Sequence, residues 1–413
     1  MIFSHYANNY WDFEKSKTSG IHKIAKYPAV MVAPMQAEIL TTLRKENPDY
    51  ITLLDPFHGS GVSLVEGGLI GLHVYGVDIN PYAYLIAKVK LTPLDKEKIF
   101  YYNSEIKRKI SINLKFDLYN FKNITKWFRE DIINDLSKIR HLINDIPDRD
   151  IRFYYWLCFG EVVRIHSNTR TSTFKLHVKN IQNIFNMENN VFGDFIERIN
   201  MYYNLIPENI KYNLFCGDAI EKIKTLASSS FDIICTSPPY GDNHTTVTYG
   251  QFSSLQLNWI DIEDIGCSKS WISNFSKIDS ASLGGNAARN ILKGEYQALN
   301  NFMNTIQPKK RKKVARFTAD YEIALIEMAR VLRPGGTLVL TLANRRIDNK
   351  EMPLVRITQE IVSACGLTQD DIICRNIKNK RMPYKLSNVN KYGAVSSMSK
   401  EIVLILTKPL KNQ

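Results

Sequence analysis

Residues 50–78 read YITLL (50–54), DPFHGSG (55–61), a helix-like segment to about Ile70, and then HVYGVD (73–78). Short apolar runs bounded by turn residues predict two buried strands, and the residues between them predict a helix. Strand, glycine turn, helix and strand in this order form a βαβ unit. The stretch therefore predicts an α/β fold built on a doubly wound parallel sheet.

The glycine turn lacks the pattern of a phosphate-binding loop. Gly61 is followed by Val62 and Ser63 rather than by Lys and Ser or Thr, and the turn does not read G-x-G-x-x-G. Asp55 would be unfavourable beside a phosphate, but it suits a ligand with a cationic group. The amino acid part of S-adenosylmethionine is such a ligand.

Acids also end the next two strands. Asp78 ends the second strand, where a carboxylate can accept both ribose hydroxyls of an adenosine, and Asp218 ends the strand at 212–218, in reach of an adenine amino group. Each acid alone could be a helix cap. Three of them at successive strand ends, with a glycine turn at the first, favour a cofactor site instead.

Later segments extend the same pattern. Strands are predicted at 212–218, 231–235, 337–343 and 401–407. Helical periodicity covers Asp320 to Val331, and Arg333-Pro334-Gly335-Gly336 predicts a turn.

Ser237-Pro238-Pro239-Tyr240 follows the strand at 231–235 and is the strongest chemical motif. Two prolines fix the backbone and remove two donors, which leaves the Pro238 carbonyl as a rigid acceptor. The Ser237 hydroxyl is a second acceptor, and two acceptors suit the two hydrogens of an exocyclic amine. The Tyr240 ring can stack on a base. A loop that merely ends a strand is the alternative.

These motifs together resemble the DNA amino-methyltransferases, which transfer methyl from S-adenosylmethionine to an exocyclic base nitrogen. The Ser-Pro-Pro-Tyr form is typical of the N4-cytosine enzymes, whereas Asp or Asn replaces Ser in the N6-adenine ones. Lys26–Pro34, Leu332–Gly336, Asn344–Arg346 and Lys380–Pro383 resemble further segments of the family.

The resemblance implies a Rossmann-like class I methyltransferase sheet with helices on both faces, plus inserted helical and target-recognition subdomains. It implies that Ser237, Pro238, Pro239 and Tyr240 are catalytic. The residues predicted to bind S-adenosylmethionine are Tyr27, Pro28, Asp55, Phe57, Gly59, Ser60, Gly61, Asp78, Ile79, Asp218, Ala219 and Thr236.

Charge and basic segments point to nucleic acid. The 413 residues hold 54 Lys plus Arg and 41 Asp plus Glu, a formal net charge of +13, which favours a polyanionic partner. Solvated surface charge is the alternative for each basic segment. The residues predicted to contact double-stranded DNA are Arg170, Lys175, Lys309, Lys310, Arg311, Lys312, Lys313, Arg316, Lys380 and Arg381.

Two long stretches interrupt the core pattern. We expect residues 1–94 to begin the methyltransferase core, 95–210 to form a mainly helical insertion, and 211–245 to carry the core with the catalytic motif. Residues 246–319 are the candidate target-recognition insertion, and 320–413 complete the core. Loops of such length without structure of their own would be unusual.

The compartment is predicted from what the chain contains. Six cysteines without a C-x-x-C pair fit free thiols in a reducing cytosol. The start has no apolar signal core, and no apolar run approaches the ~20 residues of a membrane span. We expect a cytoplasmic, nucleoid-associated protein that binds no membrane and no metal.

The sequence thus predicts a site-specific DNA methyltransferase acting on cytosine N4, with a cognate restriction endonuclease as a candidate partner. Two alternatives stay open: a methyltransferase acting on adenine N6 or an RNA base amine, and a DNA-binding protein with a vestigial site. The recognition sequence and the oligomeric state are left open.

Overall fold

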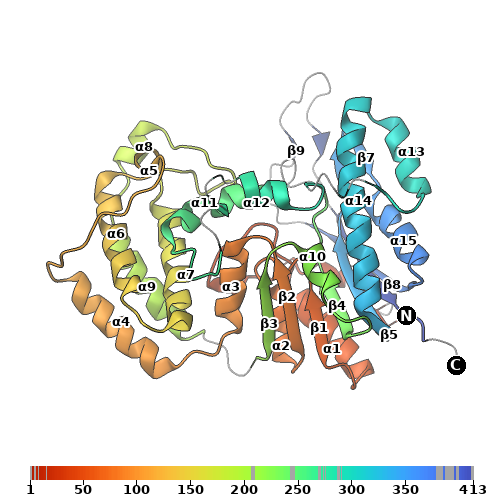
Figure 1. Cartoon of the computed structure of the whole chain (residues 1–413), viewed down its shortest axis with the longest axis horizontal. Helices are drawn as coiled ribbons and strands as arrows, with labels where there is room; N and C mark the ends of the chain where they lie inside the picture. The colour runs from red at the N-terminus through yellow and green to blue at the C-terminus, as the bar shows by residue number, and fades with distance from the viewer. Residues whose placement is uncertain are drawn as a thin grey trace.

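The structure is a computed structural model of the whole chain (Figure 1). It describes residues 2–3, 6–7, 9–14, 16–205, 210–241, 247–267, 271–272, 274, 276–285, 289, 291–377, 385–386, 395–396 and 400–410. Two short 3-10 helices, Tyr10–Asp12 and Gly20–Lys23, precede the first α-helix.

The helices are α1 (Ala33–Glu46), α2 (Val62–Leu69), α3 (Pro81–Leu91), α4 (Lys96–Ile110), α5 (Ile124–Trp127), α6 (Glu130–Asn144), α7 (Arg149–His166), α8 (Ile181–Phe185), α9 (Val191–Tyr203), α10 (Ala219–Lys224), α11 (Tyr249–Trp259), α12 (Ser276–Ala281), α13 (Gln297–Thr305), α14 (Pro308–Val331) and α15 (Leu354–Ala364). The strands are β1 (Thr52–Asp55), β2 (His73–Asp78), β3 (Tyr212–Cys216), β4 (Phe231–Thr236), β5 (Leu332–Leu342), β6 (Arg345–Ile347), β7 (Lys350–Met352), β8 (Thr368–Asn376), β9 (Lys385–Leu386), β10 (Val395–Ser396) and β11 (Lys400–Thr407).

Seven strands form one sheet in the order β3-β2-β1-β4-β5-β11-β8. The first five pair in parallel, and β11 runs antiparallel to both β5 and β8. The chain moves outward from β1 to β3, then returns to place β4 on the other side of β1. The predicted doubly wound α/β fold is confirmed, and its topological switch point lies between β1 and β4.

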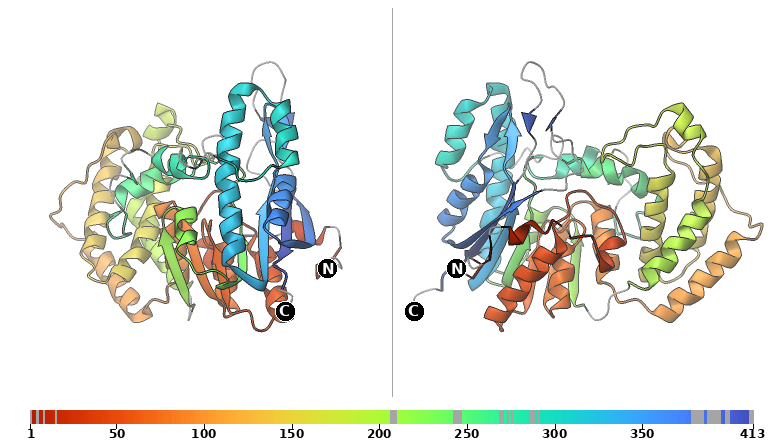
Figure 2. Two further views of the ribbon diagram at one scale, coloured as in Figure 1. Left: turned by 45° about the vertical axis from the view of Figure 1, so that its right-hand side comes forward. Right: turned by 180° about the vertical axis from the view of Figure 1, so that it is seen from behind.

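Helices cover both faces of this sheet, as predicted. Successive strand residues point to opposite faces, and the apolar residues on each face pack against helices. Leu53 and Ile233 pack with residues of α1 and α2, whereas their neighbours Leu54 and Ile234 pack with residues of α10, α14 and α15. Because neighbouring strand residues that point to opposite faces are both apolar, the sequence shows unbroken hydrophobic runs there. Figure 2 shows the red and orange N-terminal helices on the face opposite α14.

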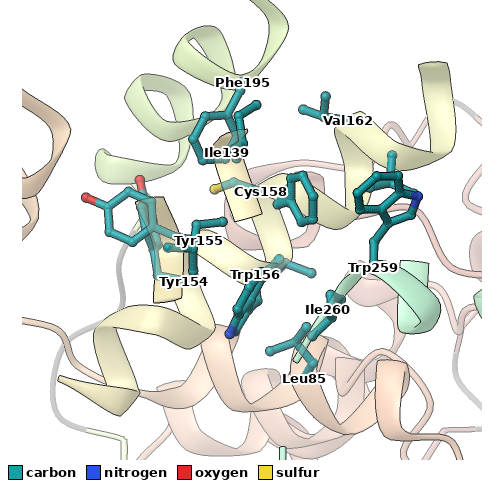
Figure 3. Packing of buried hydrophobic residues seen from close by; sticks show 14 of the residues in the cluster. Leu85, Ile139, Tyr154, Tyr155, Trp156, Cys158, Val162, Phe195, Trp259 and Ile260 are labelled. Carbon is teal, nitrogen blue, oxygen red and sulfur yellow. The ribbon is translucent and has the colours of Figure 1, made fainter. Parts of the chain in front are cut away.

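Residues 95–210 hold the helices α4 to α9, which form a lobe beside the β3 edge of the sheet (Figure 1). The centre of the lobe is the fully buried Trp156 of α7, packed among aromatic and aliphatic side chains (Figure 3). Leu85 of α3 and Trp259 of α11 belong to the same cluster. The lobe therefore shares its apolar core with helices that border the sheet.

The stretch expected to be a recognition insertion, 246–319, has no hydrophobic cluster of its own among the described residues. Leu257 and Trp259 of α11 pack into the helical lobe, whereas Leu299 of α13 and Phe317 of α14 pack on the sheet. Helix α14 also continues across the expected boundary between residues 319 and 320.

The expected turn at 333–336 lies inside β5. Gly335 has a φ of +77°, and the pairing of β5 with β4 shifts register between Phe231 and Ile233. The turn residues therefore make an irregular start to the strand rather than a separate loop. None of the helices in the described parts of the chain is long and apolar enough to cross a membrane.

Candidate active site

The site lies where the parallel strands end at the switch point of the sheet, as expected for open α/β sheets. A cavity there is lined by the glycine turn after β1, by the ends of β2 and β4, and by the start of α10. Eleven predicted site residues line it: Tyr27, Pro28, Phe57, Gly59, Ser60, Asp78, Ile79, Asp218, Ala219, Ser237 and Pro239.

The glycine turn has the backbone that its sequence requires. Gly59 and Gly61 have φ values of +50° and +76°, in the left-handed region that favours glycine. A Cβ atom on Gly61 would lie 3.0 Å from the Cβ of Ala87 in α3, so the turn also needs a small residue there. The turn leads directly into α2.

Asp78 contacts this turn directly and lines the cavity beside it. Its two carboxylate oxygens accept hydrogen bonds from the backbone N–H groups of Gly59 and Asn80, each at 2.8 Å. Burial raises the pKa of Asp78 to about 6, while these backbone hydrogen bonds lower it. Each oxygen keeps a lone pair, so the carboxylate can also accept from two neighbouring hydroxyls.

Asp55 lies behind the turn and does not line the cavity. Its carboxylate accepts hydrogen bonds from Thr236 Oγ1 at 2.6 Å, from the Phe57 N–H at 3.0 Å, and from Ser63 Oγ. Burial raises the pKa of Asp55, against the lowering effect of these donors. The carboxylate thus ties β1 to β4, and direct cofactor contacts of Asp55, Gly61 and Thr236 stay predictions.

Asp218 has two roles at once. Its Oδ1 accepts from the N–H groups of Ile220 and Glu221, so it caps α10 as the simpler interpretation of the sequence expects. It also lines the cavity and pairs with the guanidinium of Arg289. Arg289 had no sequence signal, because it stands in an irregular polar stretch without a motif.

Asn80 and Tyr249 join the N-terminal segment to the core and were also missed. Asn80 Nδ2 donates to Tyr27 Oη at 3.0 Å and to Ser253 Oγ at 2.8 Å. Its Oδ1 caps α3 by accepting from the Tyr82 N–H. The Tyr27 and Tyr249 rings stack with centroids 5.6 Å apart. An Asn before Pro81 is a recognisable cap signal, so Asn80 could have been found.

The Ser-Pro-Pro-Tyr motif stands where the cavity meets a second, larger cleft. Ser237 and Pro239 line both hollows, and all four motif residues line the cleft. The hydroxyls of Ser237 and Tyr240 lie 3.1 Å apart. Burial raises the pKa of Tyr240, so its phenol stays protonated. A group transferred from the cavity to the cleft would therefore pass this motif.

The cleft has a volume of about 1120 Å³ and a strongly basic lining. Eleven Lys and Arg side chains line it, against the two carboxylates of Glu351 and Glu401, although burial lowers the pKa of one of the eleven, Lys90, to about 7. The Arg345 guanidinium lies so close to Gly241 that a Cβ there would be 1.6 Å from its Nη1. Such a lining produces a positive potential that attracts polyanions.

The predicted DNA contacts fall into three groups. Arg170 and Lys175 are exposed and line the cleft, on the loop after α7. The basic residues of 309–316 lie on the first turns of α14 and are not among the cleft's lining. Lys380 and Arg381 lie outside the described residues.

The cavity fits an adenosine with a charged tail. Phe57, Ile79 and Ala219 give apolar walls for a base, and the Asp78 carboxylate can accept from ribose hydroxyls. A Cβ on Gly59 would meet only the Tyr27 ring, at 3.6 Å, so the backbone there is open to a ligand. Bound S-adenosylmethionine supplies an electrophilic methyl on a sulfonium. Among the described residues, no three His, Cys, Asp or Glu side chains gather as metal ligands would.

Similar proteins are methyltransferases. The type II methyltransferase M.MvaI of Kocuria varians is 32% identical over 430 aligned residues, covering 97% of this chain and 94% of M.MvaI. M.BsoBI of Geobacillus stearothermophilus, also a type II methyltransferase, is 21% identical over 293 residues, covering 61% of this chain and 55% of its own length. No family model matches the chain.

Two solved structures are also similar. One is a proposed DNA modification methylase from Thermus thermophilus, with 16% identity, a TM-score of 0.25, and coverage of 48% of this chain and 54% of its own. The other is the rRNA methyltransferase AviRa from Streptomyces viridochromogenes, with 11% identity, a TM-score of 0.30, and coverage of 92% and 87%. The Thermus protein was also solved with S-adenosyl-L-methionine bound. The near-complete alignment with M.MvaI shows that this chain belongs to the type II methyltransferases, with S-adenosylmethionine as its cofactor.

Proposed function

We propose that this protein methylates the exocyclic N4 of cytosine at a specific site in double-stranded DNA, as the modification enzyme of a restriction–modification system. The observation that carries the proposal is the position of Ser237 and Pro239 on both the cofactor cavity and the basic cleft. The serine at position 237 supports cytosine, because the motif resembles the N4-cytosine form.

The basic cleft binds the DNA. A stacked base cannot reach Ser237, so the target nucleotide has to leave the duplex at a cost of about a few kcal/mol. Phosphate contacts from the basic lining, including Arg170 and Lys175, offset this cost. The basic residues at 309–316, of which Arg311 and Arg316 are half-buried, lie outside the cleft, and their contact with flanking DNA stays a prediction.

The motif then orients the amine. The Ser237 hydroxyl and the Pro238 carbonyl accept its two hydrogens, which directs the nitrogen lone pair toward the cavity. The Tyr240 phenol, held 3.1 Å from Ser237 Oγ, fixes that hydroxyl, and its ring offers a stacking surface. With S-adenosylmethionine bound in the cavity, the amine nitrogen would form a bond to the methyl carbon as the methyl–sulfur bond breaks, leaving a neutral thioether, and one amine proton would then leave along the hydrogen bond to the motif or to solvent.

Ser237→Ala tests this assignment, with Ser230→Ala as the matched control. The exposed Ser230 hydroxyl donates to the Ala227 carbonyl in the turn before β4, and the backbone N–H of Ser230, which the substitution keeps, donates to the Val331 carbonyl. We expect Ser237→Ala to lower kcat on duplex DNA by about 10²–10³, in line with the loss of one positioned group, without weakening S-adenosylmethionine binding. Ser230→Ala should leave both unchanged. A Ser237→Ala enzyme with the original kcat would refute the role of this hydroxyl.

A further inference from the structure

Two cysteines 51 positions apart meet beside the cofactor cavity. The Sγ atoms of Cys216, the last residue of β3, and Cys267, in the segment after α11, lie 3.3 Å apart. Both side chains are partly exposed, whereas Cys158 and Cys235 are buried in apolar cores. A disulfide has an S–S distance of about 2.05 Å, so the pair needs a shift of only about 1 Å to bond.

The two thiols are chemically unequal. Their shared hydrogen bond lowers the pKa of Cys267, while the same bond and burial raise the pKa of Cys216. The thiolate is the attacking species in thiol–disulfide exchange. Cys267 is thus suited to attack an oxidant first, and Cys216 to resolve the product.

The two cysteines connect two parts of the chain whose residues line the cofactor cavity. Cys216 is followed by Gly217, whose N–H donates to the Asp78 carbonyl at 2.9 Å, and then by Asp218, which lines the cavity. Cys267 lies between α11 and α12, and these two helices, with the residues just after α12, form a cover that lines the cavity through Tyr249, Ile278, Ala281, Ser282 and Leu283. A bond between the thiols would therefore anchor this cover to the end of β3.

We propose that Cys216 and Cys267 form a reversible disulfide that tethers the α11–α12 cover and slows exchange of the cofactor. The Cys267 thiolate attacks a low-molecular-weight disulfide, forming a mixed disulfide and releasing one thiolate. Cys216 then loses its proton, and its sulfur attacks Cys267 Sγ, which releases the second thiolate. Two protein thiols are oxidised, and the small disulfide is reduced to two thiols.

Oxidised glutathione is the probe, and peptide mapping by mass spectrometry is the first readout. We expect one linked peptide joining Cys216 to Cys267, which dithiothreitol separates. In Cys216→Ser, Cys267 should instead carry a glutathione adduct. Cys374→Ser is the matched control, because Cys374 is exposed and lies on β8. It should form the same internal disulfide as the unchanged protein.

The second readout is the dissociation rate of labelled S-adenosylmethionine in a chase experiment. We expect the oxidised protein to release the cofactor roughly tenfold more slowly than the reduced one, since one added cross-link restrains opening of the cover. Cys216→Ser and Cys267→Ser should show no dependence on oxidation. Absence of the linked peptide would overturn the proposal, and so would equal release rates in the two redox states. Neither result depends on which base is methylated.

Discussion

Asp78 makes the sharpest quantitative test of the cofactor site, and Asp78→Asn is the perturbation. The substitution keeps the side-chain shape but removes the negative charge and places an NH2 group where one carboxylate oxygen stood. That NH2 would face the backbone N–H of either Gly59 or Asn80, each of which donates to Asp78, and it would also face a ribose hydroxyl that donates to the same oxygen.

The magnitude follows from the hydrogen bonds at stake. A hydrogen bond to a charged group contributes about 1.5–3 kcal/mol, and leaving a buried donor unpaired adds a further cost. We expect binding to weaken by about 2–4 kcal/mol, which corresponds to a roughly 30- to 1000-fold higher Kd for S-adenosylmethionine.

The pH dependence gives an independent check. With its pKa raised to about 6, Asp78 is protonated below about pH 6, and the neutral acid is a weaker hydrogen-bond acceptor than the carboxylate. Affinity should therefore fall about tenfold per pH unit below ~6 and be constant above it. Because the folded pKa lies above the usual 3.8, the proton-bound form also stabilises the free protein, and this stability is lost as pH rises through about 6. Asp78→Asn should show neither dependence.

Isothermal titration calorimetry measures the Kd, with Asp232→Asn as the control. Asp232 is a buried acid at the opposite end of the sheet, where its Oδ2 accepts three hydrogen bonds from Ile51 and Thr52, each at 2.8 Å. Its substitution should lower the free energy of unfolding but leave the Kd unchanged. An Asp78→Asn protein that binds S-adenosylmethionine with the original Kd would refute the assignment.

Two further predictions concern the stability of the sheet behind the cavity and the DNA affinity of the cleft. Thr236→Val removes the 2.6 Å hydrogen bond to the buried Asp55, so urea unfolding should show a loss of about 1.5–3 kcal/mol; an unchanged midpoint would contradict the tie between β1 and β4. Arg170→Ala combined with Lys175→Ala should reduce the slope of log affinity for DNA against log salt by about 1.8, measured by fluorescence anisotropy. If the Arg170 and Lys175 substitutions leave this slope unchanged, the proposed role of the cleft in DNA binding is refuted. A separate variant with the basic residues at 309–316 neutralised would show whether α14 also contacts DNA.

The sheet could be predicted from sequence because its signals are local. The strand, glycine turn and acid of 50–78 lie within one βαβ unit. Successive apolar residues such as Leu53 and Leu54, which point to opposite faces of the sheet, already indicate that both faces are covered. The Ser-Pro-Pro-Tyr motif was equally local, because two prolines fix the backbone without help from the rest of the chain.

Other features could not be predicted because they depend on distant partners. Asp55 turns away from the cavity since Thr236, 181 positions later, donates to it. The Asp218–Arg289 pair and the Cys216–Cys267 contact join segments whose approach no spacing in the sequence indicates. The early start of α14 is different in kind. Pro308 at its first turn was a usable signal, but the lysine-rich residues after it hide the apolar period.

Identification of the methylated nucleoside tests most directly whether this protein methylates cytosine N4. Duplex DNA is incubated with the enzyme and S-adenosylmethionine, digested to nucleosides and analysed by mass spectrometry. We expect N4-methylcytosine, lost in Ser237→Ala and retained in Ser230→Ala. N6-methyladenine as the only product, or no methylated nucleoside from an enzyme that binds its cofactor, would contradict it.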